Sequence, residues 1–129
     1  MDYIVLRKKV TDAGLLDRQY LYYAFKIVTT LAMVLGFGFL LFTSVNIFVQ
    51  LLAVAGLGFS FVQVSMLGHD AGHLAIFKSN KMNDLTGLLT LSLFVGTSYY
   101  YWVSRHNAHH ANPNHEDDDP DVEIGRAHV

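Results

Sequence analysis

Residues 27–68 read IVTTLAMVLGFGFLLFTSVNIFVQLLAVAGLGFSFVQVSMLG, without a single Asp, Glu, Lys or Arg. One helix that spans a bilayer needs about 20 apolar residues, and this stretch holds roughly 40. The only polar break inside it is Thr43-Ser44-Val45-Asn46, which suits a turn. The stretch therefore predicts an all-α integral membrane protein with a hairpin of two transmembrane helices, at about residues 22–42 and 47–66.

Glycines recur in both predicted spans. Small residues let the backbones of two membrane helices approach closely. We therefore expect the two spans to pack against each other at Gly36, Gly38, Gly56 and Gly58.

Positive charge orients this hairpin. Basic residues lie before the first span and after the second, and the turn between the spans has none. The positive-inside rule then predicts that both ends of the hairpin, with the N-terminus, are cytoplasmic. The basic residues are Arg7, Lys8, Lys9, Arg18 and Lys26 on one side and Lys78 and Lys81 on the other.

The overall composition narrows the possible functions. The chain has 129 residues, 52% hydrophobic and 16% charged, with a net charge of −2, which suits one domain at most. It has no basic patch of the kind that nucleic acids require. It also has no cysteine, which excludes disulfides, iron–sulfur clusters and thiolate-bound zinc. Any metal must therefore use nitrogen or oxygen ligands.

Two groups of histidines follow the long apolar stretches, in residues 68–73 (GHDAGH) and 106–110 (HNAHH). Residues three or four apart share one face of a helix, so each group can direct its imidazoles at one point. Ionisable groups at membrane depth are costly and usually functional. We therefore predict a metal site, although imidazole suits iron, zinc, copper and nickel alike. The predicted ligands are His69, His73, His106, His109 and His110.

A third uncharged stretch, residues 85–104, separates the two histidine groups. Hydropathy alone would make it a third span, which would place the groups on opposite sides of the membrane. A shared site requires the segment to lie in the interface, or to dip into the membrane and return. Its hydroxyl residues and the aromatic cluster at 99–102 favour an interfacial helix over about 85–111. Pro113 should end that helix near Ala111.

Several neighbours of the histidines also have predicted roles. Asp70 and Asn107 lie inside the two groups and could each orient a ligating imidazole through its second nitrogen. Gly68 and Gly72 flank the first group and should permit close helix packing. The aromatic cluster at 99–102 favours anchoring at the interface over contact with a substrate. The acidic run at 116–123 is typical of a solvated loop.

The two histidine groups resemble the first two histidine boxes of membrane fatty acid desaturases. The resemblance includes Ala13-Gly14-Leu15-Leu16, the hairpin, Asn112-Pro113-Asn114 and Asp119-Pro120-Asp121. It covers nearly the whole chain and is strongest to bacterial acyl-lipid desaturases.

This resemblance implies a centre of two non-haem irons, with O₂ as co-substrate, that introduces a double bond into an acyl chain. The implied iron ligands are the five histidines named above. The implied substrate is an acyl lipid or acyl thioester, and the implied electron donor is a ferredoxin or a cytochrome b5-like protein. The implied location is a bacterial inner membrane, with the histidine boxes cytoplasmic.

One departure from the family is large, because desaturases have a third histidine box after a second membrane hairpin. This chain reaches Val129 without one, and only His115 and His128 remain as further histidines. We therefore expect residues 1–129 to be the N-terminal portion of a desaturase domain, inactive alone.

Two other readings stay open from the sequence. A lipid or carotenoid hydroxylase or ketolase of the same superfamily would use similar iron chemistry. A membrane metal-binding or transport protein without redox turnover would need polar residues along its spans. The His-Asp-Ala-Gly-His and Asp-Pro-Asp elements favour the desaturase.

Overall fold

The computed structural model describes residues 2–122, and every regular element in that range is a helix. The predicted all-α fold class is therefore confirmed, while His128 lies outside the described residues. The elements are α1 (Tyr3–Asp12), α2 (Tyr20–Thr43), α3 (Ile47–Gly72), α4 (Asn80–Gly87), the π-helix η1 (Leu88–Val95) and α5 (Tyr99–Ala111).

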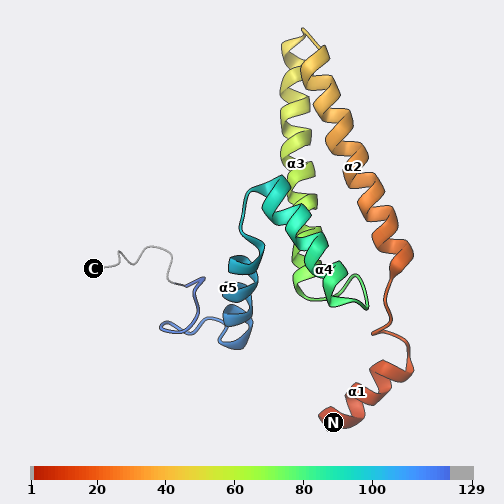
Figure 1. Ribbon diagram of the computed structural model, residues 1–129, viewed down its shortest axis with the longest axis vertical. Helices are drawn as coiled ribbons and strands as arrows, with labels where there is room; N and C mark the ends of the chain where they lie inside the picture. Colours follow the sequence, from red (N-terminus) through yellow and green to blue (C-terminus); the bar gives the residue numbers. More distant parts are fainter. Residues whose placement is uncertain (1, 123–129) are drawn as a thin grey trace.

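Helices α2 and α3 form a long antiparallel hairpin (Figure 1). The turn lies where the sequence predicts it, because Asn46 caps α3: its Oδ1 accepts hydrogen bonds from the backbone N–H groups of Phe48, at 2.9 Å, and Val49, at 3.4 Å. The 24 residues of α2 make a helix of roughly 36 Å, longer than a hydrocarbon core of about 30 Å.

The side chains of this hairpin face outward. In the most apolar part of each helix, only 6% of α2 and 17% of α3 is buried. The core helix of a soluble protein would be mostly buried, so exposed apolar surface of this extent suits lipid as the solvent. Both helices are long and apolar enough to cross a membrane, as predicted.

The glycines of the hairpin contribute less to packing than expected. At Gly56 an added Cβ would lie 2.5 Å from the Phe37 ring, so this position does require glycine. An added Cβ at Gly36, Gly38 or Gly58 would meet nothing within 4 Å. The expectation of close packing is therefore wrong for these three positions, because no atom of the partner helix approaches closely enough to require a glycine.

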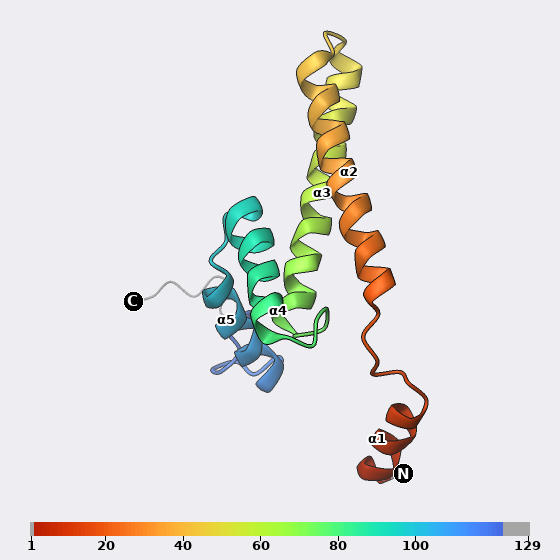
Figure 2. The ribbon, with the colours of Figure 1, turned by 45° about the vertical axis from the view of Figure 1, so that its right-hand side comes forward.

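Helices α4 and η1 run as one continuous rod along the lower part of α3 (Figures 1 and 2). Gly68 makes their contact possible, since an added Cβ there would lie 2.5 Å from Leu91 Cγ and 2.6 Å from Thr90 Oγ1. The close packing expected at Gly68 is confirmed. In Figure 2, α5 lies beside this rod, and α1 lies beyond the end of the hairpin.

The segment expected to be one interfacial helix over about 85–111 is divided. Helix η1 ends at Val95, and α5 begins at Tyr99. Gly96 has φ +82°, a left-handed conformation that glycine adopts easily, and it stops the helix. The Ser92 hydroxyl then accepts a hydrogen bond from the Tyr99 N–H at 3.0 Å. The chain therefore goes up along α3 and returns, and it ends α5 at Ala111, as Pro113 predicts.

Candidate metal centre

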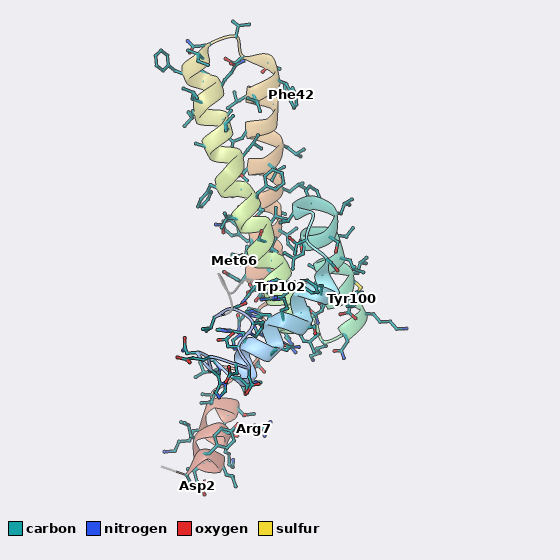
Figure 3. The ribbon with its side chains drawn as sticks, turned by 90° about the vertical axis from the view of Figure 1, so that its left-hand side faces the viewer. Asp2, Arg7, Phe42, Met66, Tyr100 and Trp102 are labelled. Carbon is teal, nitrogen blue, oxygen red and sulfur yellow. The ribbon has the colours of Figure 1, made fainter. Side chains whose placement is uncertain are left out.

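The two histidine groups meet at the end of the hairpin that is remote from its turn. His69 lies in the last turn of α3 and His73 directly follows it, while His106, His109 and His110 lie on α5. Figure 3 shows Trp102, from the same helix α5, at this end, with Phe42 at the far tip. The return of the chain after Gly96 is what carries α5 to the end of α3.

Four of the imidazoles converge closely. His106 Nε2 lies 3.0 Å from His73 Nε2 and 3.0 Å from His110 Nε2. The rings of His69 and His73 are 4.6 Å apart between centroids, and those of His69 and His106 are 4.9 Å apart. Ligand nitrogens of His69, His73 and His106 all lie within 4.8 Å of one another.

His106 Nε2 lies close to the ring nitrogens of both His73 and His110. This arrangement favours a bound cation over simple hydrogen bonds. A ring nitrogen carries either one hydrogen or one lone pair, so His106 Nε2 cannot donate to one imidazole while it accepts from another. The donor set is all imidazole, which suits iron and other transition metals. These residues therefore fit the metal that the sequence predicts.

The electrostatics of the cluster favour neutral imidazoles. Burial, together with the neighbouring histidines, lowers the pKa of His73 and of His106 below the ordinary value. A lowered pKa keeps the ring uncharged at neutral pH, and the uncharged ring is the form that binds a metal.

Asp70 lies where it can orient His69, and it has a partner that the sequence did not suggest. Its Oδ1 lies 3.3 Å from His69 Nδ1, and its Oδ2 lies 3.1 Å from Lys26 Nζ on α2. Lys26, which hydropathy would direct to the membrane surface, is mostly buried in this ion pair. The pair therefore ties the first membrane helix to the histidine cluster.

Asn107, unlike Asp70, makes no hydrogen bond to an imidazole in the described part of the chain. It is exposed on α5, and its side chain makes no hydrogen bond to any residue in the described part of the chain. Residues next to each other on a helix are turned about 100° apart, so Asn107 is directed away from the side on which His106 meets the cluster. No hydrogen bond from Asn107 therefore orients an imidazole here.

His109 has a carboxylate partner that the sequence analysis missed. Its Nδ1 lies 2.9 Å from Asp119 Oδ2 and 3.0 Å from Oδ1, and Asp119 is 0% exposed. Burial by itself raises the pKa of Asp119, but hydrogen bonds from the backbone N–H of Asp121, from His109 and from the backbone N–H of Asn114 lower it overall. One member of the acidic run is thus a buried anion beside the cluster, unlike the solvated loop expected there.

The aromatic residues at 99–102 lie in different environments. Tyr99 is 2% exposed, and burial together with Asp84 raises the pKa of Tyr99 to about 12. Tyr100 and Tyr101 are exposed. Trp102 stacks on His106, with ring centroids 4.4 Å apart and planes at 19°. One available signal was the spacing of four residues between Trp102 and His106, which puts them on one face of a helix.

Gly72 makes room for Trp102, so we expect Gly72→Ala to disturb the cluster. An added Cβ would lie 2.6 Å from Trp102 Cζ3, whereas at Gly58 it would meet nothing. We expect a loss of about 1–3 kcal/mol of stability from overpacking, and a shifted fluorescence emission, since Trp102 is the only tryptophan of the chain. Gly58→Ala is the control and should be neutral or stabilising, because alanine favours helix. Equal emission spectra and unfolding midpoints for both variants would contradict this packing.

A membrane hairpin whose open end gathers imidazoles into one cluster defines a membrane protein with a candidate metal centre. The model of the fatty acid desaturase family matches residues 45–127 of the chain, which contain both histidine groups. The chain therefore belongs to the fatty acid desaturase family.

Curated relatives agree with this membership. The chain is 35% identical over 123 residues to a Delta(8)-fatty-acid desaturase of Euglena gracilis, covering 95% of this chain and 28% of that protein. It is 32% identical to a Delta(8)-fatty-acid desaturase of Borago officinalis (95% and 27%) and 30% identical to a Delta 8-(E)-sphingolipid desaturase of Kluyveromyces lactis (95% and 21%). No solved structure matches the chain. The chain thus spans less than a third of the length of these relatives.

Proposed function

We propose that this chain supplies the first membrane hairpin and two histidine boxes to a membrane fatty acid desaturase, the enzyme that introduces a double bond into an acyl chain. The observation that carries the proposal is the position of His106 Nε2, 3.0 Å from the ring nitrogens of both His73 and His110. The named relatives are desaturases, which favours this reaction over the hydroxylase or ketolase alternatives.

The proposed metal is a pair of non-haem irons, held by His69, His73, His106, His109 and His110 together with ligands from elsewhere in the enzyme. Iron with O₂ would supply the oxidising power that breaks unactivated C–H bonds, which side-chain acid–base chemistry cannot break. The chain's own residues place the ligands: α3 and α5 hold the rings together, Asp70 directs His69, and Trp102 covers one face of His106.

The proposed substrate is an acyl lipid or acyl thioester, with a ferredoxin or a cytochrome b5-like protein as the electron donor. The position of the cluster supports a lipid substrate, because it lies at the end of two helices with exposed apolar sides. The basic residues around the same end support a cytoplasmic site. A bacterial inner membrane is the proposed location, on the resemblance to bacterial acyl-lipid desaturases.

A chimera tests this proposal. Residues 1–129 would replace the matching segment of the Euglena gracilis relative, and the membrane fatty acids of the expressing cells would be analysed. We expect a desaturated product from the chimera, none from residues 1–129 alone, and none from the chimera that carries His106→Ala.

Two outcomes would contradict the proposal. Desaturation by residues 1–129 alone would show that no further ligands are needed. A chimera that accumulates in the membrane at the relative's own level but forms no product would show that these residues do not serve as a desaturase segment.

A further inference from the structure

His109 lies at the edge of the histidine cluster, and its Nδ1 is close to a buried carboxylate. Its ring centroid is 6.2 Å from that of His106 and 5.6 Å from that of His110, farther than the rings at the centre of the cluster. Its Nδ1 points at the carboxylate of Asp119. This carboxylate comes from the loop after α5, in the Asp119-Pro120-Asp121 element.

The loop holds Asp119 in a fixed place. Asp119 Oδ2 accepts a hydrogen bond from the backbone N–H of Asn114 at 2.7 Å, and Oδ1 accepts one from the N–H of Asp121 at 2.9 Å. Arg105, on α5, donates to the carbonyl oxygen of Pro120 and lies 4.0 Å from the Asp121 carboxylate, which attaches the loop to the helix. The backbone thus positions the carboxylate.

These hydrogen bonds determine which nitrogen of His109 carries the hydrogen. A carboxylate that accepts from two backbone N–H groups presents only lone pairs to its third neighbour. His109 Nδ1 must therefore be the N–H donor, and in the neutral ring Nε2 then keeps the lone pair. That lone pair is what a metal ligand needs.

The number of hydrogen bonds that Asp119 accepts argues against its carboxylate as a metal ligand. An ionised carboxylate has about four lone-pair sites. Three N–H groups lie within 3.0 Å of this carboxylate, two from the backbone and one from His109, and the His109 N–H is shared between the two oxygens. His109, Asp119 and Asp121 do lie close enough together to hold a cation, but Asp119 is 0% exposed and both of its oxygens already accept backbone hydrogen bonds.

We propose that Asp119 is a positioning residue, which fixes the tautomer and the ring orientation of His109 so that Nε2 is presented to the metal. The inference rests on the proposed metal centre, because the orientation of Nε2 has a use only there. In this proposal, the Asp-Pro-Asp element keeps the Asp119 carboxylate in a fixed position beside His109. Asp121 takes part through its backbone N–H, while its own carboxylate is 52% exposed and lies 3.6 Å from His109 Nδ1.

The first test needs neither metal nor activity. Residues 1–129 with ¹⁵N-labelled histidine would be placed in detergent micelles at mildly alkaline pH, and the ¹⁵N shifts of each ring would report its tautomer. We expect the Nδ1–H form for His109 in the native chain. In Asp119→Asn, the asparagine NH₂ group would face a backbone N–H, so the side chain would no longer fit as an acceptor between the loop and His109. We therefore expect His109 to shift toward the Nε2–H form that free imidazole prefers. Asp118→Asn removes the same charge from an exposed residue that pairs with His115, and it should change nothing at His109.

The second test uses Co²⁺ as the probe, with its visible absorption as the readout. We expect Asp119→Asn to weaken Co²⁺ binding about 10- to 100-fold, the usual effect of losing such a partner. Asp118→Asn should bind like the native chain. If the native chain did not bind Co²⁺, the proposed metal centre would be contradicted. The proposed effect of Asp119 on the His109 tautomer would still be tested, because the ¹⁵N measurement does not depend on metal binding.

The proposal is overturned if native His109 is in the Nε2–H form, a measurement that requires no variant to fold. It is equally overturned if Asp119→Asn keeps the native helical content, the Nδ1–H form and the native Co²⁺ affinity. A change of tautomer at His109 alone, with the other histidines unchanged, supports positioning over general loss of structure.

Discussion

Replacing His106 with alanine is expected to weaken metal binding by more than about 100-fold, beyond the range seen when only an orienting partner is lost. The reason is its central place: its Nε2 is within 3.0 Å of two other ring nitrogens, and its ring stacks on Trp102. The measurement is a Co²⁺ titration of residues 1–129 in detergent, followed by visible absorption and confirmed by elemental analysis.

His115→Ala is the matched control for this experiment. His115 is also a histidine of the region after the third apolar stretch, but its side chain is 57% exposed and pairs with Asp118. We expect its loss to leave the affinity unchanged. If the His106 and His115 variants bound Co²⁺ equally well, the four converging imidazoles would not be a metal site.

Lys26→Met is expected to destabilise the folded chain by about 3 kcal/mol, the lower end of the range for breaking a buried ion pair. The lower end applies because the side chains of Lys26 and Asp70 keep 17% and 25% exposure. The substitution leaves the Asp70 carboxylate without its cation between α2 and α3. Unfolding by denaturant in detergent, followed by circular dichroism, measures the loss.

Two further variants distinguish the loss of the Lys26–Asp70 ion pair from the general effect of removing a positive charge. Lys8→Met removes the cation from the exposed pair with Asp12, whose side chains are 75% and 62% exposed, and should cost less than about 1 kcal/mol. Adding Asp70→Asn to Lys26→Met should recover part of the loss, because no unpaired charge remains. An equal effect of the two lysine substitutions would mean that the ion pair does not join the helices.

The helical hairpin could be predicted from the sequence because its signal is local. Exposing the uncharged, mostly apolar residues 27–68 to water would be costly, which favours lipid around them, and Asn46 is a good helix N-cap. The break at Gly96 was missed, although the residue is visible in the sequence. Glycine permits a left-handed turn without requiring one, and the packing of η1 on α3 near Gly68, which accompanies this turn, is a tertiary contact that a local pattern does not contain.

The histidines of the candidate site could be predicted from the sequence, but most of the residues that surround them could not. Spacing of three or four residues puts histidines on one helix face whatever the remainder of the chain does. The partners of those histidines are different, since Lys26 and Asp70 are 44 residues apart, and Asp119 lies ten residues after His109 in a loop. No periodicity connects such residues.

The sequence by itself determined the two spans, the two sets of imidazoles and the end of the last helix before Pro113, because each depends on neighbours along the chain. Only the tertiary structure decided that α5 returns to the end of α3. It also decided that one carboxylate out of an acidic run is buried against His109, and that Trp102 covers His106. These depend on which surfaces meet after the chain has turned, and burial and hydrogen-bond geometry exist only once those surfaces are in contact.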